Sequence, residues 1–245
     1  MITIEAHELT RNFNGVCAVD AIDFSVAAGE IFGFLGPNGA GKTTTIRMLT
    51  GQLRPTSGWA KVVGCDVVEE RQKMKPQIGV VFDCQNLYPR MSGRDNLVFS
   101  ARLYGVRRKR VDEVLQLVGL SQRGRDKVKT YSNGMKQRLL IARGLLHQPK
   151  VLFLDEPTRG LDPNVAREIR EIISELGQQG ITVFLTTHYM EEADRLADRV
   201  AIIDRGRIVA MDTPERLKAK LGRGERVSLE DVFVELTGRG FSISE

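Results

Sequence analysis

Hydrophobic residues alternate with polar ones at the start of this chain. Ile2 and Ile4 show this spacing, and so do Ile22, Phe24 and Val26. Alternation of this kind predicts strands with one buried face and one solvated face, which is typical of antiparallel sheets. We therefore expect a small antiparallel β unit near the N-terminus.

Farther along, short apolar runs take turns with helical segments. Val151 to Leu154 are four apolar residues in a row, which predicts a strand buried on both faces of a parallel sheet. Further strands are expected at 31–35, 60–63, 78–82, 181–185, 200–203 and 208–210. Helices are expected in between, at 43–50, 111–118, 131–146, 163–176, 189–198 and 229–236. This order predicts an α/β fold with a mostly parallel sheet, an antiparallel part near the N-terminus and a helical insertion at about 90–146.

Composition and charge narrow the class of protein. Of 245 residues, 42% are hydrophobic and 27% are charged, as in ordinary globular proteins. No apolar run approaches the roughly 18 residues of a membrane-spanning helix. The net charge of +5 suits an anionic ligand such as a nucleotide. No nucleic-acid partner is expected, because the basic run at 107–110 has no aromatic residues interleaved with it. The three cysteines lack metal-ligand spacing and are expected to be buried thiols.

The stretch that follows the predicted strand 31–35 carries the clearest chemistry. It fits the pattern G-x-x-x-x-G-K-[ST], with the residues Gly36, Pro37, Asn38, Gly39, Ala40, Gly41, Lys42 and Thr43. The backbone N–H groups of such a loop, with the N-terminus of the next helix, form a cradle for phosphate oxygens. Lys42 can reach the outer phosphates, and the Thr43 hydroxyl can ligate Mg²⁺. The alternative is a glycine-rich turn that happens to end in Lys-Thr.

Two further strands end in polar residues that could serve the same site. Asp155 and Glu156 follow the apolar run at 151–154, and His188 follows the strand at 181–185. Ligands in open α/β sheets bind at the carboxyl ends of the strands. Asp155 suits a Mg²⁺ shell, Glu156 could polarise an attacking water, and His188 could hydrogen-bond a γ-phosphate. The alternatives are a solvated acidic strand end and a histidine that caps the following helix.

Five motifs now occur in one order: the loop at 36–43, Ser-x-Gly at 132–134, the apolar run ending in Asp155-Glu156, Gly160-Leu161-Asp162-Pro163, and Thr187-His188. This order resembles the nucleotide-binding domain of ABC transporters over residues 1 to about 222. The resemblance implies a P-loop NTPase core with a β subdomain, at 1–89 and 147–222. It also implies a helical subdomain at about 90–146, followed by a short tail at 223–245.

The resemblance also implies roles for single residues. ATP is expected to contact the loop at 36–43 and Thr44, with adenine stacked on Phe13; the alternative for Phe13 is a core aromatic. Ser132, Asn133 and Gly134 match the signature loop that contacts the γ-phosphate held by a partner subunit. Asp162 matches a loop that signals across the dimer, although helix capping explains it equally well. Glu156, His188 and Lys42 match catalytic positions, and Thr43 with Asp155 match the Mg²⁺ ligands.

The sequence departs from the family pattern at two places. The usual signature Leu-Ser-Gly-Gly-Gln is here Tyr-Ser-Asn-Gly-Met at 131–135, which keeps the serine and the second glycine. The loop after the strand at 78–82 usually begins with a glutamine that touches Mg²⁺. That position holds Asp83, and Gln85 follows two residues later, so both are candidates for this role.

Finer features at 131–137, 186–194 and 228–233 resemble the ABC-2 type exporters. This resemblance implies an ATPase at the cytoplasmic face of the membrane that binds MgATP and powers a separate transmembrane permease. It also implies a dimer, either of two copies or with a related ATPase. The alternative is a soluble ABC-type ATPase without a permease, as in iron–sulfur assembly. The transported substrate is not encoded in any of these motifs.

Overall fold

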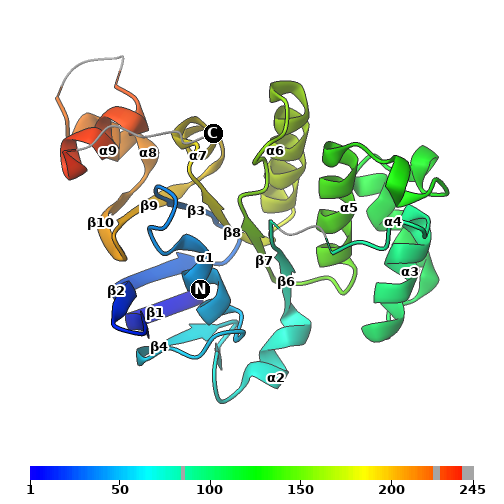
Figure 1. The fold of residues 1–245 in the computed structure, drawn as a ribbon, viewed down its shortest axis with the longest axis horizontal. Helices are drawn as coiled ribbons and strands as arrows, with labels where there is room; N and C mark the ends of the chain where they lie inside the picture. Colours follow the sequence, from blue (N-terminus) through cyan, green and yellow to red (C-terminus); the bar gives the residue numbers. More distant parts are fainter. Residues whose placement is uncertain (84–85, 223–226, 239–245) are drawn as a thin grey trace.

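Two β-sheets and a set of helices make up the molecule in the computed structural model, which describes residues 1–83, 86–222 and 227–238 (Figure 1). The larger sheet has six strands in the order β10-β9-β3-β8-β7-β6, and only β10 runs antiparallel to its neighbour. Its strands are β3 (Ile31–Leu35), β6 (Ile78–Val81), β7 (Val151–Asp155), β8 (Thr182–Thr187), β9 (Arg199–Asp204) and β10 (Arg207–Asp212).

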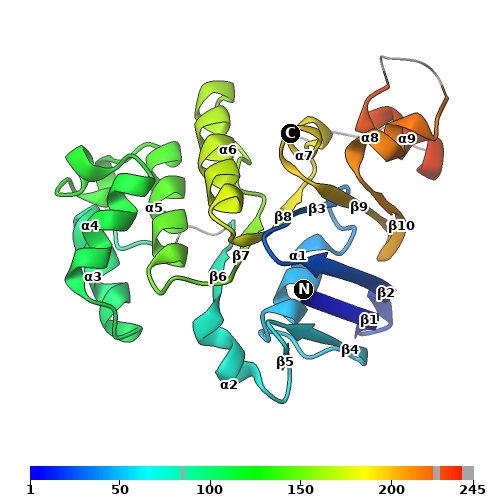
Figure 2. The same ribbon diagram turned by 180° about the vertical axis from the view of Figure 1, so that it is seen from behind.

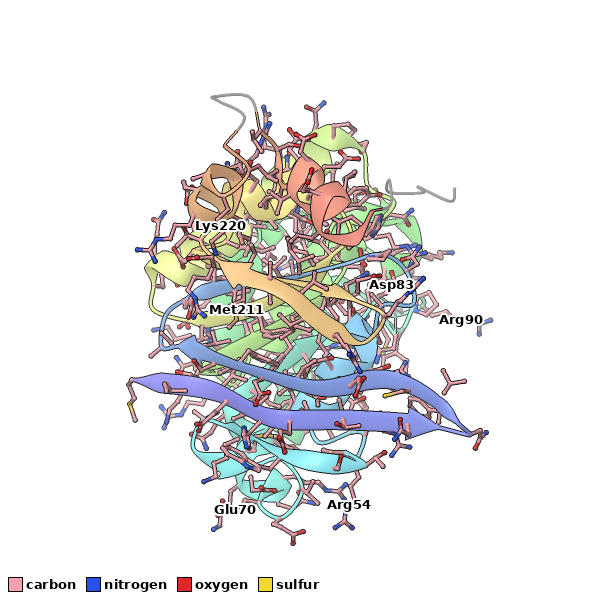
Figure 3. The ribbon with its side chains drawn as sticks, turned by 90° about the vertical axis from the view of Figure 1, so that its left-hand side faces the viewer. Arg54, Glu70, Asp83, Arg90, Met211 and Lys220 are labelled. Carbon is pink, nitrogen blue, oxygen red and sulfur yellow. The ribbon has the colours of Figure 1, made fainter. Side chains whose placement is uncertain are left out.

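A second sheet of four antiparallel strands lies against one face of the first (Figures 1 and 2). It contains β1 (Ile2–Phe13), β2 (Val16–Ala27), β4 (Ser57–Val62) and β5 (Cys65–Asp66). Asn14 and Gly15 connect β1 to β2, both with positive φ (45° and 86°), as the tight hairpin turn of an Asn-Gly pair requires. Figure 3 views this hairpin from the side, with Arg54 and Glu70 below it and Met211 above it.

The space between the two sheets is filled by α1 (Lys42–Leu49) and by aromatic side chains. Alternate residues of β3, β7 and β8 point into this layer, and their neighbours point to the opposite face of the sheet. Phe24, Phe32, Phe34, Phe153 and Phe184 form one cluster there, with ring centroids 5.5 to 5.9 Å apart. Ring pairs at this separation add to the stability gained by burying the rings. The cluster fixes the strands that carry the site described below.

The opposite face of the large sheet is covered by α6 (Pro163–Gln178) and α7 (Met190–Leu196), and its β6 edge by α5 (Asn133–Leu145). The helices α3 (Gly93–Leu103) and α4 (Arg108–Leu117) pack on α5 away from the sheet (Figure 1). Two glycines allow α5 to touch the sheet directly. A Cβ on Gly79 of β6 would come within 2.4 Å of the carbonyl oxygen of Gly144 in α5, so that neither strand nor helix could keep its place.

Smaller elements complete the fold. A short helix α2 (Arg71–Met74) and a 3₁₀ turn precede β6, and α8 (Pro214–Ala219) and α9 (Leu229–Thr237) follow β10. Leu229, Val232 and Phe233 of α9 are buried against α7, α8 and β9. Within the described residues, no helix is both long enough and apolar enough to cross a membrane.

The predicted fold class is confirmed: an α/β P-loop NTPase core with an antiparallel β part and inserted helices. The subdomain boundaries stay a prediction, and residues 223–226 and 239–245 of the predicted tail lie outside the described residues. The expectation of buried cysteines was wrong for the two that are described. Cys17 is exposed beside the β1–β2 turn, and Cys65 is only half-buried. An isolated cysteine carries no periodicity that would indicate its face, and this hairpin end extends beyond the core.

Candidate active site

Three parallel strands end side by side at one edge of the large sheet, and each carries residues of the predicted site. β3 leads into the loop at 36–43, β7 ends at Asp155, and β8 ends at Thr187. The backbone N–H of Gly36 lies 3.4 Å from the carbonyl oxygen of Thr187. Residues that are far apart in the sequence therefore meet because the sheet is parallel.

The loop at 36–43 has the backbone that its glycines predict. Gly39 and Gly41 have φ of 80° and 109°, values that residues with a side chain rarely adopt. A Cβ at Gly36 would lie 2.3 Å from the carbonyl oxygen of Ile203, so the first glycine is required by packing. The loop leads directly into α1, whose first residue is Lys42. Positive partial charge at the start of a helix favours an anion there.

Lys42 is buried beneath the loop and is held by three oxygen atoms. Its Nζ donates to the carbonyl oxygens of Gly36 (2.7 Å) and Pro37 (3.1 Å) and forms an ion pair with Oε1 of Glu156 (3.0 Å). Nδ1 of His188 lies 2.6 Å from the other carboxylate oxygen, Oε2. The three predicted catalytic side chains thus form one continuous chain of contacts, with 13% or less of each side chain exposed.

Asp155 contacts the last residue of this loop, Thr43, rather than Lys42. Its carboxylate accepts hydrogen bonds from the hydroxyls of Thr43 (2.9 Å) and Thr186 (2.7 Å). Burial raises the pKa of Asp155, and the hydrogen bonds from the two threonines oppose that shift. Thr186 was not among the predicted site residues. Two adjacent threonines directly after the apolar residues 183–185 were the sequence signal that could have revealed it.

A change of backbone conformation separates the two neighbouring carboxylates. Asp155 closes β7 in extended conformation, whereas Glu156 has a φ of 51° and its N–H bonds to the carbonyl oxygen of Thr186 (3.1 Å). Residues other than glycine with positive φ are uncommon and often mark functional sites. The turn directs Asp155 to Thr43 and Glu156 to Lys42, so that adjacent acids have different partners. The interpretation of an ordinary solvated acidic strand end does not fit, since both side chains are buried.

The remaining predicted residues lie around this cluster. Phe13 is 40% exposed at the end of β1, with the Arg11 guanidinium 4.5 Å from its ring centroid, so it is not a core aromatic. Asp162 caps α6 by accepting a hydrogen bond from the N–H of Val165 (3.1 Å), and Ser132 caps α5 in the same way. His188 does not cap α7, because it contacts Glu156 instead. The roles of Phe13 and Asp162 toward a ligand or partner stay predictions.

The signature loop has a packing role in its own chain. Ser132 and Asn133 are exposed, whereas Gly134 is buried against α6. A Cβ at Gly134 would lie 2.2 Å from Cγ1 of Val165, so only glycine fits there. Contact of this loop with a second nucleotide stays a prediction.

One of the two candidates in the loop after β6 is described. Asp83 is exposed and pairs with Arg159 across a distance of 3.2 Å (Figure 3 labels Asp83). Arg159 lies between Glu156 and Asp162, so this ion pair links the loop after β6 to the loop after β7. Gln85 lies outside the described residues, and the choice between the two stays open.

Proteins of similar sequence indicate an ATP-binding role, as the geometry of the site does. The sequence profile of the ABC transporter family matches residues 19–159. The linearmycin resistance ATP-binding protein LnrL of Bacillus subtilis is 40% identical over 243 residues, which cover 98% of this chain and 76% of that protein. The daunorubicin/doxorubicin resistance ATP-binding protein DrrA of Streptomyces peucetius is 45% identical over 223 residues, which cover 89% and 68%.

Solved structures of ATP-binding subunits have the same fold as this chain. The ATP binding subunit of an ABC transporter superposes with a TM-score of 0.84 at 28% identity, over 96% of this chain and 99% of that one. A dimeric ATP-binding cassette in a post-hydrolysis state, bound to ADP and Pi, gives 0.75 at 25% identity, over 86% and 98%. The buried Lys42, Asp155 and Glu156 beside a phosphate-type loop supply the groups that such an activity needs. The chain therefore belongs to the ABC transporter family, as one of its ATP-binding, ATP-hydrolysing subunits.

Proposed function

We propose that this chain is the ATPase of an ABC-2 type exporter and works at the cytoplasmic face of a membrane. The observation that carries the proposal is the buried chain Lys42–Glu156–His188 beside Asp155, at the edge of the sheet where β3, β7 and β8 end. The resistance proteins to which the chain is similar support an export role. No feature of the described residues favours the alternative of an ABC-type ATPase that works without a permease.

The residues present fit a bound Mg²⁺. Asp155 and Thr43 offer a buried carboxylate and a hydroxyl that already face each other at 2.9 Å, and oxygen is the ligand that Mg²⁺ prefers. Bound there, the ion would neutralise charge on the β- and γ-phosphates of ATP. Thr43 and Asp155 would hold it, and Thr186 would orient Asp155 through its 2.7 Å hydrogen bond.

When nucleotide binds, the ion pair between Lys42 and Glu156 opens and each side chain takes a new partner. In this structure the ammonium and the carboxylate neutralise each other. Phosphate oxygens in the cradle provide a second, stronger partner for Lys42, and this frees Glu156 to accept a proton from a water molecule. His188 contacts Glu156 from the other side at 2.6 Å and can donate to a phosphate oxygen once Glu156 turns toward the water. Positioning and charge stabilisation of this kind are the main contributions of a protein to phosphoryl transfer.

A second copy of the chain is proposed to complete the site. Ser132 and Asn133 lie at the start of α5 with their side chains exposed, and their own chain's phosphate loop does not use them. The N-terminus of α5 can receive the γ-phosphate of a nucleotide bound to the other copy. The pair would then hold two nucleotides in its interface, and a related ATPase could replace one copy.

A groove between the sheet and the inserted helices is proposed to receive the permease. Its volume is about 750 Å³, and it lies along β6, α3 and α5. Tyr88, Phe99, Leu103 and Tyr104 line it while remaining 42% to 73% exposed. Clustered exposed aromatic residues are typical of protein interfaces. We assign the groove to a cytoplasmic helix of the membrane subunit, which would contact the loop after β6 at the same time.

Two measurements test the proposal. The purified chain should hydrolyse ATP in the presence of Mg²⁺, and Lys42→Ala should abolish nucleotide binding. A tagged chain expressed in its own host should retain a multi-spanning membrane protein, and Tyr88→Ala with Phe99→Ala should release that protein while ATP hydrolysis by the isolated chain persists. Failure of the tagged chain to retain any membrane protein would contradict the export role. Absence of hydrolysis in a folded, ATP-binding chain would contradict the catalytic assignment.

A further inference from the structure

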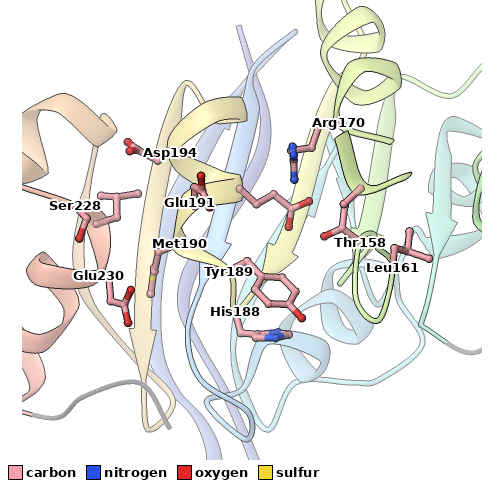
Figure 4. A pocket seen from close by; sticks show the side chains of 13 residues that line it. Thr158, Leu161, Arg170, His188, Tyr189, Met190, Glu191, Asp194, Ser228 and Glu230 are labelled. Carbon is pink, nitrogen blue, oxygen red and sulfur yellow. The ribbon is translucent and has the colours of Figure 1, made fainter. Parts of the chain in front are cut away.

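A pocket of about 420 Å³ lies directly behind the catalytic histidine, between α6, α7 and α9 (Figure 4). Arg170 and Thr158 point into it from the side of α6, and His188 lies at its base together with Tyr189. Glu192 and Leu229 also line it. The pocket therefore touches three segments at once: the loop after β7, the segment after β8, and the C-terminal helix.

Glu192 is the unusual group of this pocket. Only 2% of its surface is exposed, and neither carboxylate oxygen has a described partner in good hydrogen-bond geometry, although the hydroxyls of Thr187 and Thr158 lie near them. A buried carboxylate without a partner is costly, so such a group either stays protonated or acquires a partner. Burial raises its pKa, and the negative charge of Glu156 adds to that shift. The hydroxyls of Thr187 and Thr158 and the charge of Arg170 oppose it.

Arg170 is the basic residue of the pocket lining that could pair with Glu192. The other acids at the pocket have partners of their own, since Asp194 pairs with Lys218 and Glu191 with Arg195. Arg170 forms no ion pair with any described residue, although its charge lowers the pKa of Glu192. The guanidinium and the carboxyl group therefore border the same empty space, at a separation too large for an ion pair.

The positions of the two residues connect them to the two sides of the active site. Glu192 lies in the first turn of α7, four positions after His188. Arg170 lies on α6, which begins directly after the Asp162 cap and follows the loop that carries Glu156. Closing the distance between them would draw the first turn of α7 toward α6. His188 would move with α7, and the loop from Glu156 to Asp162 would be held on the other side.

We propose that Glu192 and Arg170 are positioning residues that form an ion pair when the active site closes around ATP, and that this pair fixes His188 relative to Glu156. The inference rests on the proposed role of His188 in hydrolysis. Neither side chain contacts nucleotide in this arrangement, so the pair acts through His188. In the nucleotide-free chain the pair is open.

The test compares Glu192→Gln, Arg170→Met and the double variant with the unaltered chain. Each single variant should lower kcat by about tenfold, which corresponds to ~1.4 kcal/mol in the barrier. Nucleotide affinity should stay within about twofold, and the Tm of the nucleotide-free chain should not fall, because the pair is open in that state. The double variant should be no slower than the slower single variant, since residues that act as one pair have non-additive effects. Arg170→Lys, which keeps the charge, should recover part of the loss.

Glu191→Gln is the matched control. Glu191 precedes Glu192, is exposed, and pairs with Arg195 on the surface, so its replacement should leave kcat unchanged. Multiplied losses in the double variant would overturn the proposal, and so would unchanged turnover in Glu192→Gln. Losses of kcat that follow a fall in Tm would also overturn it, because they would indicate a purely structural role. Failure of the unaltered chain to hydrolyse ATP would instead overturn the proposed function, and that control separates the two conclusions.

Discussion

Replacing Glu156 with glutamine is expected to destabilise the nucleotide-free chain and, at the same time, to strengthen ATP binding. Among the described residues, the carboxylate is the only anionic partner of the buried ammonium of Lys42, at 3.0 Å. Glutamine keeps the size of the side chain and removes the charge. The ammonium would retain the carbonyl oxygens of Gly36 and Pro37 as acceptors.

The expected magnitude follows from that geometry. Removing one partner of a fully buried ion pair typically costs ~3–5 kcal/mol. Because Lys42 keeps two carbonyl acceptors and the new amide oxygen can accept a hydrogen bond, we expect a loss of about 2 kcal/mol. For a chain of this size, 1 kcal/mol shifts Tm by ~2–4 °C, so Tm should fall by roughly 4–8 °C. ATP no longer has to separate Lys42 from an anion, and a gain of ~1.4 kcal/mol would raise its affinity about tenfold.

The assay combines thermal unfolding with and without MgATP, nucleotide titration, and the rate of hydrolysis. Turnover should fall by ~10²–10⁴-fold if Glu156 is the general base. Glu30→Gln is the matched control. Glu30 is also buried, pairs with Arg199 at 3.2 Å, and accepts a hydrogen bond from the N–H of Ala27, but it lies away from the phosphate loop. Its replacement should lower Tm equally with and without ATP.

The test is whether ATP restores the stability of one variant and not of the other. Saturating ATP should remove the stability deficit of Glu156→Gln and leave that of Glu30→Gln unchanged. If Glu156→Gln has a lower Tm and also loses ATP affinity, the carboxylate supports the loop rather than competing with phosphate for Lys42, and the reasoning is refuted. If turnover persists, Glu156 is not the base.

Three further predictions concern separate parts of the molecule. Asp155→Asn should weaken ATP binding in Mg²⁺ but not in EDTA, because Asp155 would act through the ion; titration with a fluorescent ATP analogue checks this. Burial lowers the pKa of His147, so its contribution to stability is present at neutral pH and lost as pH falls below the ordinary value near 6.5; His147→Gln should therefore reduce the drop in Tm between about pH 7.5 and pH 5.5. Gln85→Ala should impair transport by the complex more than ATP binding, and impairment by Asp83→Ala alone would assign the role to Asp83 instead.

The position of the candidate site in the fold could be predicted from sequence because the informative patterns are local. An apolar run that ends in Asp155 and Glu156, and another that enters a glycine-rich loop, predict two strand ends on one edge of a parallel sheet. The N-caps at Ser132 and Asp162 follow from residue type and position in the same way. For these features a few neighbouring residues contain all the information needed.

The contacts within the site could not be predicted from sequence. The ion pair of Lys42 with Glu156 depends on the positive φ of Glu156, which sets two adjacent carboxylates in different directions. The burial of Glu192 depends on α6 and α9 closing over a short helix that has acids at three of its first five positions. The exposure of Cys17 depends on how far a hairpin projects beyond the core. Each is a property of tertiary packing, to which local periodicity gives no access.

The close contact of Gly79 with Gly144 is a point about which α5 could tilt as a rigid body. Backbone meets backbone there, with no side chain between strand and helix to deform, so the contact can act as a fulcrum. Ser132 lies twelve residues away at the other end of α5, at a distance of about 18 Å along the helix axis. A tilt of about 10° at the fulcrum would displace Ser132 by about 3 Å, the length of one hydrogen bond. A small rotation at the sheet edge, beside the groove, is thus enough to make or break the phosphate contact proposed for Ser132 at the far end of the helix.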